Sequence, residues 1–187
     1  DLSGAGELAN TYLPGGDSYI DSTSLNVWFA GILTQKSLVA VRMEEIQLIT
    51  EFIKTKAGAT TITAVGVGTF VPDVLHAAVV IPSLSRVALM DGLGAYRSLT
   101  EHEQYLPRYM LSVVSGAIST YDLPDLVAAL SPRPVWVSGM QNGAGQALSP
   151  AELEKLYPAN ATHLRLFTST EAKNESMALQ EWIEKVK

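Results

Sequence analysis

Residues 60–80 read TTITAVGVGTFVPDVLHAAVV and predict a strand, a tight turn and a helix in immediate succession. The β-branched residues of 60–65 favour a strand, and the glycines of 66–68 end it. Residues 72–80 are rich in Ala and Leu and begin with proline, which suits the first turn of a helix. Because the same order recurs along the chain, we expect an α/β fold. Its strands should run mostly parallel, with helices on both faces of the sheet, as a three-layer sandwich.

The rest of the chain supplies the other elements of this sheet. Short strands are expected at residues 86–90, 135–137 and 162–167. Helices are expected at residues 24–33, 37–58, 102–114, 123–130, 149–157 and 175–186, and a turn at residues 14–17. A sheet of about four strands leaves at least one edge open, so something else is expected to cover that edge.

The helix at residues 37–58 shows the clearest helical spacing. Its apolar residues recur every three to four positions, which predicts one face turned to the core and places Arg42 on the wet side. Ser37 and Gly58 are residue types that begin and end helices. The apolar set is Leu38, Val41, Ile46, Ile49, Phe52 and Ile53.

The composition is that of an ordinary globular domain and argues against several classes of function. The chain has 187 residues, 47% of them hydrophobic and 17% charged, which suits one domain. A net charge of -6 without a cluster of Lys or Arg argues against binding of nucleic acid or of an anionic membrane surface. No apolar run reaches the roughly 18 residues of a membrane span. We expect no cofactor, and the absence of cysteine excludes thiol nucleophiles and thiolate metal sites.

The opening of the chain has neither an initiating Met nor the pattern of a signal peptide. Residues 1–7 read DLSGAGE, which is typical of a loop that follows a strand. We therefore expect residues 1–187 to form a single domain that is part of a longer protein.

A resemblance to a known family is carried by residues 121–134, which read YDLPDLVAALSPRP. This stretch is similar to the Tyr-Asp-Leu-Pro-Asp-Leu and Ala-Pro-Arg-Pro segments of acetylxylan-esterase-like α/β-hydrolases. Residues 1–7 resemble the Asp-x-Arg-Gly-x-Gly-Glu loop of that group, and residues 75–78 resemble its Leu-x-Ala-Ala helix. Arg42 stands where the helix before the nucleophile strand often carries Arg in this group.

This resemblance implies a partial α/β-hydrolase fold that begins just after the fourth strand of the complete one. The early loop that supplies one oxyanion N–H in these hydrolases would then be missing. The resemblance also implies descent from a carboxylic-ester hydrolase, and a secreted or periplasmic location.

The nucleophile position of such a hydrolase lies in a Gly-x-Ser-x-Gly turn between a strand and a helix. Here the turn reads Gly66-Val67-Gly68-Thr69-Phe70, so Gly68 stands at the serine position and has no atom that can attack. Thr69 could substitute for serine, although a simple connecting turn is favoured over that reading. A phosphate cradle formed by the two glycines is a third and weaker hypothesis.

The acid and the histidine of a catalytic triad are also missing. The resemblance places Asn142 at the acid position, where an uncharged side chain cannot stabilise an imidazolium ion. An Asn that shapes a loop turn is the favoured alternative. Residues 168–174, where the histidine would lie, contain none. We therefore assign no catalytic residue, and regard Gly68 and Asn142 as vestigial triad positions.

The histidines elsewhere offer weak candidates. His163 is expected within the last strand and is more readily structural than catalytic. His76 lies on an apolar helix and is expected to be packed. His102 stands between Glu101 and Glu103, but neighbours on a helix diverge by about 100° and cannot converge on one metal ion, so a solvated helix start is favoured.

Two further groups of residues allow a functional and a structural interpretation. Asp122 and Asp125 could pair for acid–base chemistry, but they bracket Pro124 at a helix start, where acids meet the positive end of the helix dipole. The tryptophans could form a sugar platform, but each follows an apolar pattern, and core packing is favoured. They are Trp28, Trp136 and Trp182.

The function expected from these observations is that of a non-catalytic, degenerate α/β-hydrolase-like domain. It would be structural or accessory in a polysaccharide-processing protein, with another domain or chain of the same protein as partner. One alternative is an acetylxylan esterase or related carbohydrate esterase whose essential residues lie outside this chain. A third hypothesis is a carbohydrate-binding module, with a carbohydrate ester as the possible ligand of a residual pocket.

Overall fold

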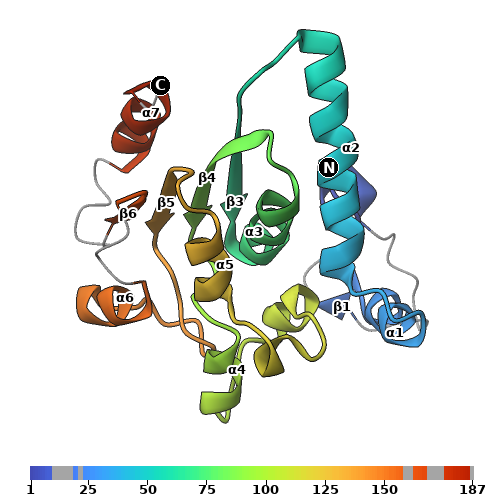
Figure 1. Ribbon diagram of the computed structural model, residues 1–187. Coiled ribbons are helices and arrows are strands. Elements are labelled where there is room, and N and C mark those ends of the chain that lie inside the picture. Colours follow the sequence, from blue (N-terminus) through green and yellow to red (C-terminus); the bar gives the residue numbers. More distant parts are fainter. Residues whose placement is uncertain (10–18, 21–22, 158–161, 168–174, 186–187) are drawn as a thin grey trace.

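A computed structural model describes residues 1–9, 19–20, 23–157, 162–167 and 175–185 (Figure 1). The expected turn at residues 14–17 and the loop at 168–174 lie outside these residues. Within the described part, a parallel sheet has the strand order β3-β4-β5-β6. Its strands are β3 (Ile62–Val67), β4 (Leu84–Met90), β5 (Val135–Ser138) and β6 (Leu164–Phe167). The expected α/β class and parallel sheet are confirmed.

Helices lie on both faces of this sheet, as a three-layer sandwich requires (Figure 1). The face that we call the front carries α2 (Leu38–Ala57), α3 (Val71–Val80) and α5 (Leu123–Ala129), and the back carries α7 (Glu175–Lys185). The remaining elements are β1 (Tyr19–Ile20), β2 (Thr23–Ser24), α1 (Leu25–Leu33), α4 (Arg97–Glu101), α6 (Pro150–Leu156) and 3-10 turns at Gly6–Leu8, Gly68–Phe70, Pro107–Ser112 and Ala117–Ser119.

The strands divide their side chains between two cores, because successive residues of a strand point to opposite faces. Val87 and Val135 enter the larger core on the front, under α3 and α5. Ala88 and Trp136 enter the smaller core on the back, where Trp182 of α7 covers them. The two central strands are therefore buried on both faces, as parallel strands usually are.

The expected starts and stops of the helices are confirmed at several positions. The Ser37 hydroxyl accepts a hydrogen bond from the backbone N–H of Ala40, and Gly58 ends α2 in the left-handed region at φ 62°. Ser149 and Glu152 form a capping box at the start of α6.

The helix expected at residues 102–114 is wrong. The chain leaves α4 at Glu101, and later forms only the 3-10 turn Pro107–Ser112. Leu106 is extended, with ψ 123°, because the ring of a following proline disfavours the helical conformation. The bounds of the four strands also shift by one to two residues, since β3 runs from Ile62 to Val67, β4 begins at Leu84, β5 ends at Ser138 and β6 begins at Leu164.

The expectation of a single core-facing side on α2 is also wrong. Arg42, expected on the wet side, is buried with 2% of its surface exposed. Phe52, expected in the core, is 63% exposed, and Ile49 is exposed as well. The helix packs against α3 with one side and presents a second apolar side to the outside.

Candidate functional site

The turn after β3 leads directly from the strand into the 3-10 turn Gly68–Phe70 and α3. Active sites of open α/β sheets lie at the carboxyl ends of the strands, which is where this turn stands. A Cβ on Gly66 would come within 3.1 Å of the Phe70 carbonyl oxygen and the Val71 Cα, so any larger residue would crowd the start of α3. Gly68 is left-handed, with φ 61°, and a Cβ on it would meet no described atom within 4 Å. The position is open but carries no reactive group.

Thr69 is held in this turn by its backbone. Its carbonyl oxygen accepts a hydrogen bond of 2.8 Å from the Ser112 hydroxyl, which ties the turn to the 3-10 segment Pro107–Ser112. This contact anchors the turn to that segment through the backbone. The role of Thr69 as a nucleophile stays a prediction.

A buried ion pair anchors α2 and the first residues of the chain beside the same turn. Arg42 Nη1 lies 3.2 Å from Asp73 Oδ2 in the first turn of α3, and both side chains are buried. The guanidinium also donates through Nε to the Ser3 carbonyl oxygen and lies over the Phe70 ring. Asp73 Oδ1 finds no hydrogen-bond partner among the described residues. Burial raises the pKa of Asp73 to about 7, although Arg42 opposes the rise.

His76 is packed, as expected, and both ring nitrogens are engaged. Nδ1 donates to the Pro72 carbonyl oxygen at 2.7 Å, because a carbonyl can only accept, so Nε2 accepts from the Tyr121 hydroxyl at 2.9 Å. Burial lowers the pKa of His76, which keeps the ring neutral near pH 7. The ring joins α3 to the segment before α5 and does not serve as a base for the turn at Gly68.

The other two histidines also lie away from that turn. His163 precedes β6 instead of lying within it, which corrects the expectation, and it therefore stands at the amino end of the strand. His102 follows α4 instead of starting a helix, and its Nδ1 lies 2.7 Å from the Ser98 carbonyl oxygen. Among the described residues, no group of three His, Asp or Glu side chains could hold a metal ion.

Asn142 shapes its own loop, as the structural interpretation expected. Its side-chain oxygen accepts hydrogen bonds from the backbone N–H groups of Ala144, at 3.0 Å, and Gln146, at 2.9 Å. Its amide nitrogen donates to the Gln146 side chain. This network closes an Asx-type turn after β5.

The two aspartates at the start of α5 form its cap, as expected. Asp122 and Asp125 build a reciprocal capping box, and each accepts a backbone N–H. Asp122 also accepts from the backbone N–H of Tyr96, at 2.6 Å, and so ties α4 to α5. Both carboxylates therefore serve as structural hydrogen-bond acceptors.

The tryptophans do not form one surface. Trp136 stacks on Phe167 at 3.8 Å between ring centroids and lies near Trp182, so two of the three are in the core as expected. Trp28 is only half-buried on α1, where it meets the edge of Phe29. The hypothesis of a shared sugar platform is therefore wrong.

The structure brings together two carboxylates that the sequence interpretation missed. Asp91 follows β4 in a left-handed conformation, with φ 54°, which is unusual for a residue other than glycine. Its pKa is raised, first by partial burial and then by the nearby Glu175. Glu175 Oε1 is buried without a hydrogen-bond partner among the described residues. The position of Asp91 directly after a strand could have marked it in the sequence. Glu175 lies far away in the sequence, so no local pattern links the two carboxylates.

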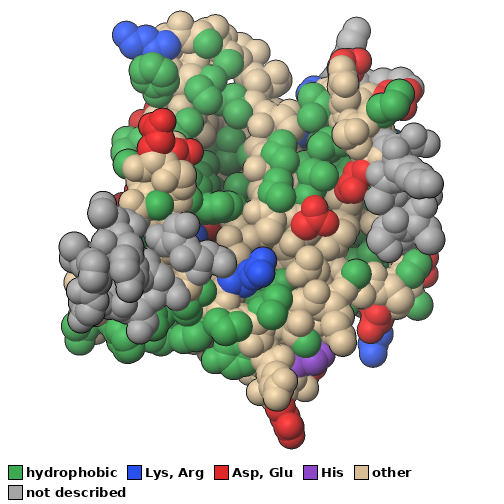
Figure 2. All heavy atoms as spheres, turned by 180° about the vertical axis from the view of Figure 1, so that it is seen from behind, with side chains coloured by type: hydrophobic (Ala, Val, Ile, Leu, Met, Phe, Trp, Pro, Cys, Tyr) green, Lys and Arg blue, Asp and Glu red, His purple; other side chains and the backbone are tan. Residues whose placement is uncertain are grey.

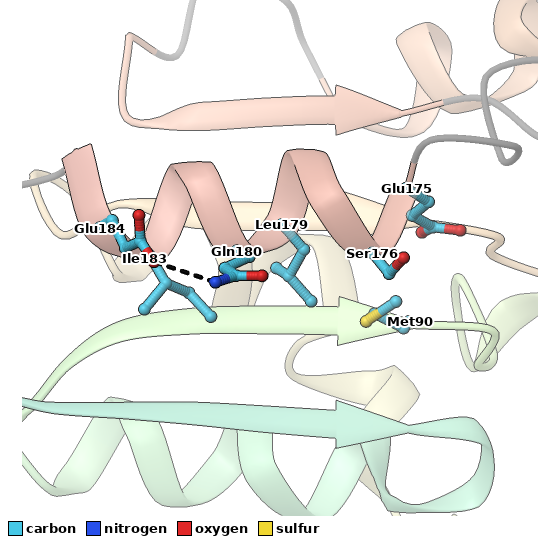
Figure 3. Close-up of a pocket in the computed structure, with 7 residues that line it drawn as sticks. All are labelled: Met90, Glu175, Ser176, Leu179, Gln180, Ile183 and Glu184. Atoms are coloured by element: carbon cyan, nitrogen blue, oxygen red, sulfur yellow. Dashed lines mark hydrogen bonds between the residues drawn. The ribbon is translucent and has the colours of Figure 1, made fainter.

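The two pockets do not coincide with the Gly68 turn. One, of about 450 Å³, lies between α7 and Met90 on the back of the sheet (Figure 3). Leu179 and Ile183 supply its apolar wall, and Glu175 stands at one end. The other, of about 340 Å³, lies between α4, the Asn142 loop and α6. Neither pocket is lined by Gly68.

Comparisons of the chain with models of known protein families, with curated proteins and with solved structures find no match. The resemblance to acetylxylan-esterase-like hydrolases therefore stays a prediction that rests on the quoted sequence stretches. Of the described helices, none is both long and apolar enough to cross a membrane.

Proposed function

We propose that this chain is a non-catalytic α/β-hydrolase-like domain with a structural or accessory role in a polysaccharide-processing protein. The observation that carries the proposal is the turn at Gly68. Its left-handed backbone and the open space above it suit an elbow, yet a glycine stands there. A turn of this shape without a side chain can connect β3 to α3 but cannot attack an ester.

The contacts of the histidines support the same proposal. All three histidines of the chain lie in described segments, and each has a contact away from the turn. Asn142 holds its own loop. Loss of one triad member alone typically costs several orders of magnitude in rate, so the combined losses are difficult to reconcile with esterase activity of this chain.

One observation favours a carbohydrate esterase that uses residues from outside this chain. In the described part, β3 has a strand on one side only, so the turn at Gly68 lies at an open edge of the sheet. A partner at that edge could bring a nucleophile and a base to the turn. This second candidate requires the partner for any turnover.

Hydrolysis of p-nitrophenyl acetate tests the proposal. The wild-type chain, Thr69→Ala and the control Thr100→Ala, an exposed position on α4, should all match the uncatalysed background. Turnover that Thr69→Ala abolishes and Thr100→Ala retains would overturn the proposal and make Thr69 the nucleophile. Turnover that appears only in a longer natural form of the protein would favour the second candidate.

A further inference from the structure

The free edge of β3 is a six-residue strand without the usual protection. The residues are Ile-Thr-Ala-Val-Gly-Val, with no charged side chain and no proline. Its only pairing partner among the described residues is β4. Exposed edges of this kind normally carry a charge, a proline or a covering element, because they otherwise pair with other chains.

The back face of β3 is also uncovered. Val65 and Val67 are 44% and 49% exposed, whereas Ala88 and Trp136, which face the same side in the next two strands, are fully buried. Val65 lies beside Ala88 in the parallel register, so both face the back. The cover that α7 gives therefore ends at β4, where the pocket in Figure 3 opens.

The second wall of this region is the outer side of α2. Leu48, Ile49 and Phe52 recur at helical spacing and are exposed. In Figure 1, α2 stands beyond the β3 edge, next to α3 and outside the four strands. Figure 2 shows hydrophobic side chains along the column of α2 at the upper left and over the middle of the sheet. The helix is placed to cover strands that would continue the sheet past β3.

We infer that the β3 edge and the outer side of α2 together accept extended strands of a different polypeptide segment, which continue the sheet beyond β3. This inference rests on the accessory role proposed above, and it names the partner's chemistry. The incoming strand pairs with the β3 backbone, turns apolar side chains towards α2 on the front, and continues the Val65 surface on the back.

A second copy of this chain is a poorer occupant. Two identical β3 edges pair around a two-fold axis perpendicular to the sheet, so both copies keep the same face forward. The front of β3 is already covered by α3, and α2 stands beyond the edge. Each α2 would therefore meet the helices of the other copy. A segment whose strand has a bare front face fits beneath α2 without this conflict.

The test uses a fluorescent peptide that has the sequence of residues 60–68 with a lysine added at each end. It serves as a probe strand for the β3 edge. We expect saturable binding to the chain, measured by anisotropy, with at least tenfold weaker affinity for Val65→Lys and for Phe52→Lys. The control Leu33→Lys changes an exposed apolar residue on α1 and should bind as the wild type does. Hydrogen exchange should show new protection in β3 on binding.

Two results would overturn the inference. The first is that the peptide shows no saturable binding. The second is that the wild type and the three variants bind it equally, while circular dichroism shows that each is folded. Sedimentation that reveals a dimer of the chain, dissociated by Val65→Lys, would assign the edge to a second copy instead. These outcomes are independent of ester hydrolysis: Thr69-dependent turnover would refute the non-catalytic role even if the peptide binds.

Discussion

The two edges of the sheet are protected differently. The β6 edge is four residues long and has the exposed Arg165 in its middle. The guanidinium lies over the rings of Phe167, at 4.8 Å, and Trp136, at 5.6 Å, so the edge carries a charge held by cation–π contacts. The β3 edge is longer and has no charge. The comparison teaches that one edge carries the charge that protects an exposed strand and that the other lacks it.

The largest expected effect lies in the core next to the protected edge. Trp136→Ala should lower the free energy of unfolding by about 3–5 kcal/mol, because it opens a cavity between β5 and α7. The matched change Val65→Ala, on the same face at the open edge, should cost less than about 1 kcal/mol since that side chain is half-exposed. Urea unfolding of both variants checks the difference. Similar losses for the two would contradict an uncovered back face at β3.

The next effect is the pH dependence of stability that Asp73, the partner of Arg42 on α2, should produce. Because burial raises the pKa of Asp73 from 3.8 to about 7, its protonated form is favoured by folding. Its contribution to stability is fully present below about pH 4 and is lost as pH rises to about 7, by a few kcal/mol at most.

Urea unfolding at several pH values between 4 and 8 measures this loss. In Asp73→Asn the pH-dependent part should disappear, because the amide does not titrate. The control Glu51→Gln, at an exposed position of α2, should keep the wild-type slope. A difference between wild type and Asp73→Asn that stays constant with pH would refute the raised pKa of Asp73.

A smaller effect is expected at the protected edge itself. Arg165→Ala removes the cation–π contacts and should cost about 0.5–1 kcal/mol in stability. It should also increase self-association, because the β6 edge then resembles the β3 edge. Light scattering against protein concentration measures the association, with Arg108→Ala as a charge-matched control. Unchanged association would show that Arg165 does not guard this edge.

The smallest effect is expected from a polar residue at the open edge. Val65→Thr keeps the β-branched shape and should change the free energy of unfolding by no more than about 0.5 kcal/mol. It should nevertheless improve solubility, measured by ammonium sulfate precipitation, because it interrupts the apolar back face. A loss of 2 kcal/mol or more would mean that this valine is buried in solution and that the edge is already covered.

The parts of the fold that the sequence predicts are those that depend on residues close together in the sequence. The start of α2 depends on Ser37 and Ala40, and the turn before α3 on Gly66 and its closest contacts. A local pattern was sufficient in both cases. The helix expected at residues 102–114 fails for a local reason too, because Pro107 disfavours the helical conformation of Leu106.

The parts that could not be predicted depend on distant contacts. Arg42 is buried because Asp73, 31 positions away, and the first residues of the chain surround it. The proximity of Asp91 to Glu175 comes from the packing of α7 against the sheet. At the candidate site, the sequence already favoured Asn142 as a residue that shapes its loop, but its partners Ala144 and Gln146 come from the structure.

The glycine at position 68 also affects the stability of the fold. A residue with a side chain at φ 61° would hold the turn in a sparsely populated conformation, at a cost of about 1–3 kcal/mol. Enzymes accept such costs because activity requires them, and stability is commonly exchanged for function. A glycine at this point avoids that strain, so the connection from β3 to α3 keeps its left-handed turn without the cost.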